Sequence, residues 1–198
     1  MKLLCLADKI DPGLWDYYRR EKTAGIDMIL ACGDLPPKYL EFLVTMANCP
    51  LLYVRGNHDE LVHMSPPEGC ECVEDKLVTV NGLKILGLGG SMKYRDGEDM
   101  YTERQMARRV RLASLKTMLS GGVDIVMTHA PVKGYGDLPD IPHQGFDCFD
   151  SYLTHFHPRF LVHGHVHATY TAGKFQRVRE HPSGTRIINA YESYMLEL

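Results

Sequence analysis

The stretch Leu51-Leu52-Tyr53-Val54-Arg55-Gly56-Asn57-His58-Asp59 decides the fold of this chain. Its first four residues form a continuous apolar run, which is typical of a strand that is buried on both faces of a sheet. Gly56 allows a sharp turn after that strand because it has no side chain to obstruct the backbone. Asn57 and His58 then place a neutral oxygen and an imidazole at the strand end, and an imidazole can exchange a proton near neutral pH. Taken alone the stretch is also an ordinary polar turn, so its interpretation depends on the other strand ends.

Four further apolar runs end in residues of the same chemistry. They are 2–7 before Asp8, 28–32 before Asp34, 123–128 before His129, and 159–162 before His165 and His167. Ligands of α/β proteins bind at the carboxyl ends of the strands, so we expect these side chains to meet at one edge of a sheet. Each residue taken singly has a structural interpretation as a helix cap or a turn residue. Their joint appearance after buried strands favours a common site.

The chemistry of this set indicates a metal site. Two carboxylates, one amide oxygen and three imidazoles suit divalent ions of borderline hardness, such as Mn, Fe, Zn or Ni. The set is large enough for two ions if one carboxylate bridges them. Two ions held about 3.5–4 Å apart can activate water and neutralise the oxygens of a phosphate.

Length and composition describe a globular chain. Its 198 residues fit a single domain, 1–198, that can bury a sizeable core. The net charge of −3 gives no indication of nucleic-acid or membrane binding, and we expect neither as a partner. The chain has no apolar run long enough to span a membrane. The apolar N-terminus is interrupted by Asp8, Lys9 and Asp11, too early for a signal peptide, so we expect a cytoplasmic protein.

Helices and a hairpin are predicted between the strands. The expected helices are 12–23, 36–47, 102–120 and 149–156, and the expected hairpin strands 76–80 and 83–88 flank Asn81-Gly82, which suits a type I′ turn. Thr102 and Gln105 fit a capping box, and Gly121-Gly122 fits a helix end. Short strands are expected at 187–189 and 194–196. The segment 130–146 is rich in Pro and Gly and has the length of a functional lid.

The helix 102–120 is basic and has two interpretations. It carries five cationic residues, Arg104, Arg108, Arg109, Arg111 and Lys116. One interpretation is a face that binds phosphate or RNA. The absence of interleaved aromatic residues favours the other, a solvated helix face.

The cysteines fit a reducing compartment. Cys5 and Cys32 lie in apolar strand runs, where a thiol behaves as a small hydrophobic group. Cys70 and Cys72 could be half of a zinc site. Because no second pair has matching spacing, we favour reduced thiols without a metal.

The motifs at the strand ends resemble a known family. They are Gly33-Asp34, Gly56-Asn57-His58-Asp59, Thr128-His129 and Gly164-His165-Val166-His167, in the order and spacing of the calcineurin-like metallophosphoesterases. The resemblance covers nearly the whole chain, 8–189, and is to the bacterial-type single-domain members. It implies an α/β fold, a four-layer α/β/β/α sandwich, with a dinuclear metal site at one end of the paired sheets.

The resemblance also implies which residue serves which metal. Asp34 would bridge the two ions, Asp8 and His167 would serve the first ion, and Asn57, His129 and His165 would serve the second.

The sequence departs from the family pattern at two places. The first motif of the family is Asp-x-His, but Ile10 stands where the histidine is expected, so the first ion lacks an imidazole. Asp11 is a weak substitute because the following Pro12 restricts its backbone. Lys9 either places an ammonium near the site or faces solvent. Asp34 is followed by Leu-Pro-Pro rather than Arg-Gly, which argues against the protein Ser/Thr phosphatases.

The sequence therefore predicts a metal-dependent phosphoesterase that hydrolyses a small phosphodiester or phosphomonoester. A metal-bound hydroxide is expected to attack phosphorus. His58 would stabilise the developing charge or protonate the leaving oxygen, and Asp59 would either orient His58 or cap a helix. Asn57, His58 and His143 are the candidate substrate contacts. The other histidines, treated as structural or exposed, are His63, His155, His157, His163 and His181.

Two other functions stay open at this stage. One is a catalytically degenerate metal- or nucleotide-binding protein of the same fold, for which Ile10 is the reason. The other is a nuclease acting on polymers, for which the basic helix is the candidate surface and the net charge is the counter-argument.

Overall fold

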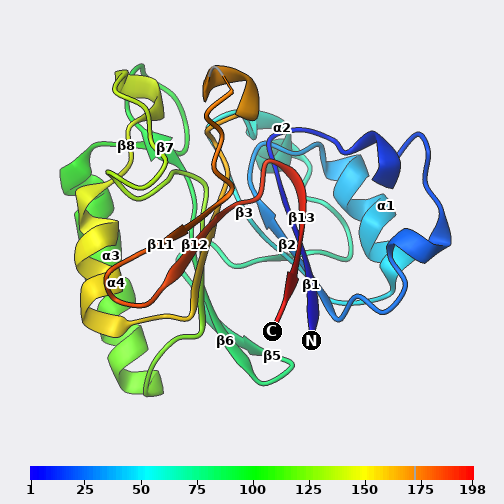
Figure 1. Ribbon diagram of the computed structural model, residues 1–198, viewed down its shortest axis with the longest axis horizontal. Helices are drawn as coiled ribbons and strands as arrows, with labels where there is room; N and C mark the ends of the chain where they lie inside the picture. The colour runs from blue at the N-terminus through cyan, green and yellow to red at the C-terminus, as the bar shows by residue number, and fades with distance from the viewer. Residues whose placement is uncertain (172) are drawn as a thin grey trace.

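Two β-sheets packed face to face form the centre of the molecule in the computed structural model, which describes residues 1–171 and 173–198 (Figure 1). The first sheet, in spatial order, consists of β13 (Glu192–Glu197), β1 (Lys2–Ala7), β2 (Met28–Cys32), β3 (Leu51–Val54) and β4 (Glu71–Cys72). The second consists of β11 (Val178–Glu180), β12 (Arg186–Asn189), β10 (Phe160–His163), β9 (Ile125–Thr128), β6 (Leu83–Leu88) and β5 (Leu77–Val80). A small separate pair is formed by β7 (Ser91–Met92) and β8 (Met100–Tyr101).

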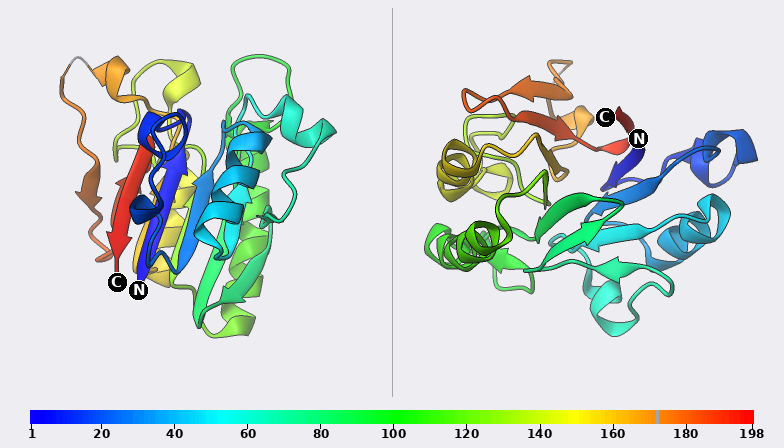
Figure 2. Two further views of the ribbon diagram at one scale, coloured as in Figure 1. Left: turned by 90° about the vertical axis from the view of Figure 1, so that its right-hand side faces the viewer. Right: turned by 90° about the horizontal axis from the view of Figure 1, so that it is seen from below.

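Helices cover the outer faces of both sheets. Helix α1 (Pro37–Ala47) lies outside the first sheet, and α3 (Glu103–Ser120) and α4 (Asp147–Phe156) lie outside the second (Figures 1 and 2). The short helix α2 (Glu60–Met64) follows the motif Gly56-Asn57-His58-Asp59. This layer order confirms the predicted four-layer α/β/β/α sandwich.

The alternation of side chains along the strands explains the layers. In β1, Leu3 and Cys5 pack between the two sheets, whereas Leu4 and Leu6 pack toward α1. Successive strand residues point to opposite faces, so a continuous apolar strand supplies both cores. Strands β1, β2 and β3 run parallel, as do β12, β10, β9 and β6. Their carboxyl ends therefore gather at one edge, where the polar residues follow.

The hairpin and the long helix form as predicted. Asn81 and Gly82 both have positive φ, 51° and 81°, as a type I′ turn requires. At the start of α3, Thr102 Oγ1 accepts the Gln105 N–H at 3.3 Å, and Gln105 Oε1 accepts the Thr102 N–H at 2.8 Å. Gly121 ends the helix in the left-handed conformation with φ 74°. The other predicted elements are present within a few residues of the expected bounds, except for the first helix.

The predicted helix 12–23 is wrong. The segment contains two 3₁₀ turns, Pro12–Leu14 and Arg20–Lys22, joined by irregular backbone. It follows the surface of α1, where the Trp15 ring packs edge-on against Phe42 with ring centroids 5.0 Å apart. Contacts with another element therefore override the local helix propensity of this segment.

Several short elements were not predicted. Strands β4 and β11 lie at sheet edges and are short and polar, and α2 spans only five residues. Such segments have no clear hydrophobic period, so sequence patterns give no signal for them. Within the described ranges, none of the helices is long and apolar enough to cross a bilayer.

Candidate metal centre

The predicted ligands meet at the carboxyl edge of the two sheets. Asp8 follows β1, Asp34 follows β2 after a glycine, and His129 follows β9. Ligand atoms of these three residues all lie within 4.8 Å of one another. The tertiary structure therefore joins residues that are far apart in the chain, from Asp8 to His129, which is the arrangement that a metal site needs.

The backbone at this edge adopts uncommon conformations. Asp8, Asp34 and His165 have φ values of 67°, 57° and 67°, in the left-handed region that residues with a side chain rarely occupy. Such conformations cluster at functional sites because the surrounding structure must hold them in place. Here the Asp8 N–H donates to the Gly33 carbonyl at 3.1 Å, which ties the ends of β1 and β2 together.

Glycines permit the ligands to approach each other. A Cβ atom on Gly56 would lie 2.1 Å from Asp34 Oδ1, and one on Gly164 would lie 2.6 Å from Asp8 Oδ2. Any side chain at these positions would displace a candidate ligand. This packing explains why Gly precedes Asn57 and His165 in the motifs.

Hydrogen bonds to the backbone orient His129. Its Nδ1 lies 2.7 Å from the Cys32 carbonyl oxygen, so Nδ1–H donates there and Nε2 is directed at the other ligands. Nε2 lies 3.2 Å from Asn57 Oδ1 and 3.4 Å from Asp34 Oδ2. Because His129 is fully buried, this orientation leaves its ring little freedom.

His165 is oriented in a similar way from the opposite side. Its Nε2–H donates to the Pro142 carbonyl at 2.6 Å, which leaves Nδ1 as the free ring nitrogen. Nδ1 lies 3.2 Å from His129 Nε2. The sequence did not predict the contact with Pro142, since nothing in the pattern of the segment 130–146 indicates which carbonyl would reach the site.

Three further side chains surround Nε2 of His129. Ligand atoms that lie about 2.0–2.1 Å from a tetrahedrally coordinated ion are about 3.3 Å from each other. The separations around His129 Nε2 are 3.2 Å to Asn57, 3.2 Å to His165 and 3.4 Å to Asp34. Asn57, Asp34 and His165 thus each lie near His129 Nε2, and their role as ligands of the second metal stays a prediction.

Opposite charges shift the pKa values of Asp34 and His129. Burial opposes the charged form of each residue, but their mutual attraction outweighs it and lowers the pKa of Asp34 to about 2. In the same way, despite burial, the carboxylate of Asp34 raises the pKa of His129 to about 10. Burial and the charge of His129 lower the pKa of His165 to about 3. Near neutral pH Asp34 is therefore a carboxylate and His165 a neutral imidazole, and without a bound ion the positive charge that Asp34 attracts lies on His129.

The set predicted for the first metal is smaller. Both oxygens of Asp8 accept the backbone N–H of His165, at 2.9 and 3.0 Å. His167 Nε2 lies 3.6 Å from Asp8 Oδ1, and its ring stacks on Tyr170 with centroids 4.6 Å apart. Asp8 and His167 are therefore neighbours at this position, beside the shared Asp34.

The position of the missing histidine does not supply a replacement ligand. Ile10 packs against the hydrophobic cluster between the first sheet and α1. Asp11 accepts a hydrogen bond from the Ser193 hydroxyl, and Lys9 forms an ion pair with Glu192. The three residues are thus engaged in packing or in other contacts.

His58 and Asp59 have different surroundings. His58 is exposed and borders a hollow of about 130 Å³ together with Asp34, and its backbone N–H donates to Asp34 Oδ1 at 2.8 Å. Asp59 is buried, and its Oδ2 accepts the backbone N–H groups of Asp34 at 2.9 Å and Gly56 at 2.7 Å. Among the described hydrogen bonds, those of the Asp59 side chain go to the backbone and none goes to the His58 ring. Burial, followed by the charge of Asp34, raises the pKa of Asp59 to about 6.

His143 reaches the site from the long loop. It lies in the 3₁₀ turn Ile141–His143, and its ring centroid is 5.3 Å from that of His165 and 4.9 Å from that of Tyr170. Its Nδ1 is paired with Asp140. The loop thus places a candidate substrate contact beside a candidate metal ligand.

Arg109 of the basic helix α3 has a structural role. Arg109 forms ion pairs with Glu74 and Asp75, and it donates to the Gly89 carbonyl at 2.8 Å. The exposed arginines of α3 border a shallow hollow, which is lined by Lys93, Thr102, Arg104, Gln105, Arg108 and Arg111. Whether they bind phosphate or only face solvent stays a prediction.

Sequence comparison identifies the family. The model of the family described as calcineurin-like phosphoesterase matches residues 3–169. The chain belongs to this family. Membership implies divalent metal ions, and Asp8, Asp34 and His129 form a group that could hold one. A search of curated protein sequences finds no match to this family member.

Three solved structures are similar to this phosphoesterase family member. A hypothetical protein from Thermus thermophilus is 16% identical, with a TM-score of 0.54 over 96% of this chain and 75% of that one. A 5'-nucleotidase from Candida albicans is 12% identical, with a TM-score of 0.51 over 96% of this chain and 45% of that one. An archaeal phosphodiesterase is 13% identical, with a TM-score of 0.47 over 100% of this chain and 93% of that one. The first two show that the fold is shared.

Proposed function

We propose that the protein is a metal-dependent phosphoesterase that hydrolyses a small phosphomonoester or phosphodiester with two divalent ions. The observation that carries the proposal is the convergence of Asp34, Asn57 and His165 on His129 Nε2 at 3.2–3.4 Å. Each of these four side chains carries an atom that can bind a divalent ion, and they gather around one ring nitrogen of a fully buried histidine. The backbone carbonyls of Cys32 and Pro142 support the same proposal. They accept hydrogen bonds from the rings of His129 and His165 and so fix which ring nitrogen would face an ion.

The proposed ligands divide into two sets that share Asp34. Asn57, His129 and His165 hold one ion, and Asp8 and His167 hold the other. When bound, such ions activate water and neutralise the charge that develops on the phosphoryl oxygens. Mn, Fe, Zn and Ni all suit this mixture of carboxylate, amide and imidazole donors.

Three residues of the chain are proposed to act on the substrate. His58 is exposed at the mouth of the site, so its ring can approach a phosphoryl oxygen and deliver a proton to the leaving oxygen. The Asn57 side-chain oxygen faces His129, so its amide N–H groups can donate to a phosphoryl oxygen. His143 lies beside His165 and can contact the leaving group from the loop. Asp59 acts indirectly by holding the backbone of Asp34.

Free thiols support a cytoplasmic location for this activity. All six cysteines are unpaired, and Cys5 and Cys32 are buried in strands of the first sheet. A reducing compartment keeps such thiols free.

One observation favours a second function, a metal-binding protein of this fold that has lost turnover. Ile10 packs toward α1 and supplies no donor atom, so the first ion has only Asp8, His167 and the shared Asp34. If the first ion does not bind, the second ion alone cannot stabilise both the attacking and the leaving oxygen of the phosphoryl group.

The test is the hydrolysis of p-nitrophenyl phosphate and bis-p-nitrophenyl phosphate with Mn²⁺, together with a metal count for each chain. The Asp34→Ala and His58→Ala variants should lose nearly all turnover. His155→Ala is the matched control, because His155 is an exposed histidine of α4 outside the site. Full turnover in a folded Asp34→Ala variant would overturn the proposal. One bound ion in each chain without turnover in Mn²⁺, Fe²⁺, Zn²⁺ or Ni²⁺ would favour the second function.

A further inference from the structure

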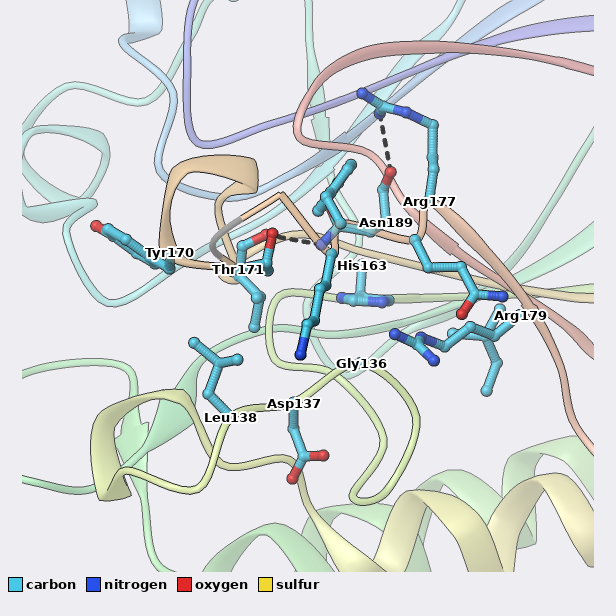
Figure 3. A pocket seen from close by; sticks show the side chains of 14 residues that line it. Gly136, Asp137, Leu138, His163, Tyr170, Thr171, Arg177, Arg179 and Asn189 are labelled. Carbon is cyan, nitrogen blue, oxygen red and sulfur yellow. Dashed lines mark hydrogen bonds between the residues drawn. The ribbon is translucent and has the colours of Figure 1, made fainter.

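A second pocket lies outside the metal centre, on the helix-facing side of the second sheet. Its volume is about 350 Å³, which is within the range of small-molecule sites (Figure 3). Residues at the end of β10, in β11 and β12, and in the loop after β9 form its walls. None of the six candidate metal ligands belongs to the described lining.

Strand alternation explains why polar side chains point into this pocket. Leu161 of β10 and Ile187 of β12 pack toward the helices, so His163, two residues after Leu161, faces the same side. Arg179 of β11 is the register partner of Ile187, and paired residues of antiparallel strands share a face. His163 and Arg179 therefore enter the pocket beside an apolar wall.

Arg179 has a buried donor that is not satisfied. Its Nε is buried and has no hydrogen-bond partner among the described residues, where Arg179 also forms no ion pair. Gly136 packs closely against it, because a Cβ atom there would lie only 3.1 Å from Nε. A buried N–H of a cation without an acceptor is costly, and an anion bound beside the Arg179 guanidinium in the pocket would offset that cost.

His163 supplies an acceptor in the same pocket. Only 2% of the residue is exposed, and its Nδ1–H donates to the Gly164 carbonyl at 2.9 Å. Nε2 is then left with a lone pair and has no partner in the described part of the chain. A neutral imidazole in this tautomer accepts a hydrogen bond from a hydroxyl group.

The charge of the pocket favours an anion. Three cationic side chains line it, from Lys174, Arg177 and Arg179, against the single carboxylate of Asp137. That carboxylate is engaged in its own loop, since Oδ1 accepts the Gly134 N–H at 2.9 Å and Oδ2 accepts the Gly145 N–H at 3.1 Å. Figure 3 shows it directed away from the side of the pocket that holds His163.

We propose that this pocket binds a small organic anion that also carries a hydroxyl group. Arg179 binds the anionic oxygen, and Nε2 of His163 accepts the hydroxyl proton as a hydrogen bond. The carbon skeleton lies against the apolar side chains of Val166, Ile187 and Leu138. Hydroxycarboxylates and hydroxylated phosphate compounds share this chemistry. The proposal does not depend on the proposed hydrolytic activity.

The test is isothermal titration calorimetry of the metal-loaded full chain with two matched pairs of probes that cannot be hydrolysed. The carboxylate pair is gluconate and hexanoate, and the phosphonate pair is 2-hydroxyethylphosphonate and ethylphosphonate. In at least one pair the hydroxylated probe should bind more tightly than its partner, and the pair that binds identifies the anionic group.

Substitutions in and beside the pocket test whether the probes bind there. Arg179→Gln should weaken it roughly tenfold or more, because a hydrogen bond to a charged group is lost. The matched control is Arg186→Gln, which removes the same charge from the neighbouring strand, where Arg186 pairs with Glu180, and should leave binding unchanged. Leu138→Trp, which retains Arg179 and fills the pocket, should also abolish binding.

Three results would overturn the proposal. They are no binding of any probe, equal affinity within both pairs, and unchanged binding in both Arg179→Gln and Leu138→Trp. Because binding is measured without turnover, loss of the proposed hydrolytic function would leave this result intact.

Discussion

The carboxylate of Asp59 holds the backbone of Asp34, because Asp59 Oδ2 accepts the Asp34 N–H at 2.9 Å. The same oxygen accepts the Gly56 N–H at 2.7 Å. One buried side chain therefore fixes the turns that follow β2 and β3, including the left-handed conformation of Asp34. We infer that Asp59 positions Asp34, the proposed bridging ligand, rather than acting on the substrate.

Replacing Asp59 with Ala should destabilise the protein and weaken metal binding together. Two buried N–H groups would lose a charged acceptor, so the free energy of unfolding should fall by about 3 kcal/mol. Urea unfolding and metal titration measure the two effects. Asp59→Asn retains an acceptor oxygen, so its stability and its metal affinity should both fall less than those of Asp59→Ala. Equal metal affinity in the wild type and in Asp59→Ala would contradict the positioning role.

Adding one methyl group at Gly56 should disrupt the metal centre without removing a ligand. Its Cβ would lie 2.1 Å from Asp34 Oδ1 and 2.7 Å from His129 Cε1, so both ligands must move. We expect metal affinity in Gly56→Ala to fall by roughly tenfold or more, since misplaced ligands lose coordination geometry. Gly97→Ala is the control, because the nearest atom there is the flexible end of Met100 at 3.1 Å. Wild-type affinity in Gly56→Ala would show that Asp34 is not a ligand.

Removal of metal should lower the melting temperature. An ion that binds only the folded state adds stability, about 2.7 kcal/mol when its concentration is a hundred times its dissociation constant. Differential scanning calorimetry with and without a chelator measures the change. The His129→Ala variant should show a clearly smaller difference, because one of the two proposed ions loses a ligand. An equal chelator effect in His129→Ala would place the metal elsewhere.

Ile10→Ala should affect stability and leave the metal count unchanged. Ile10 is only partly buried and packs toward α1, so its truncation should cost about 1–2 kcal/mol, less than for a fully buried isoleucine. Urea unfolding measures this cost, and elemental analysis gives the number of ions in each chain. A lower metal count in a stably folded Ile10→Ala variant would show that this position shapes the first metal site after all.

Local patterns in the sequence predicted most elements of the fold. The continuous apolar runs predicted β1, β2 and β3 because a strand buried on both faces must be apolar throughout. The Asn81-Gly82 turn and the capping box at Thr102 were recognisable because each depends on residues close together in the chain. The segment 12–23 was mispredicted because its conformation depends on contact with α1, a distant element.

The candidate site likewise has features that the sequence predicts and features that depend on distant contacts. The sequence by itself determined which donor atoms follow the strands, because parallel strands bring their carboxyl ends to one edge. Only the tertiary structure decided that Cys32 and Pro142 carbonyls orient His129 and His165, and that Asp59 binds the backbone of Asp34. These contacts join residues far apart in the chain and use carbonyl or N–H groups that every residue carries. Residue identity therefore gives no signal for them, and only the packing of the two sheets brings them together.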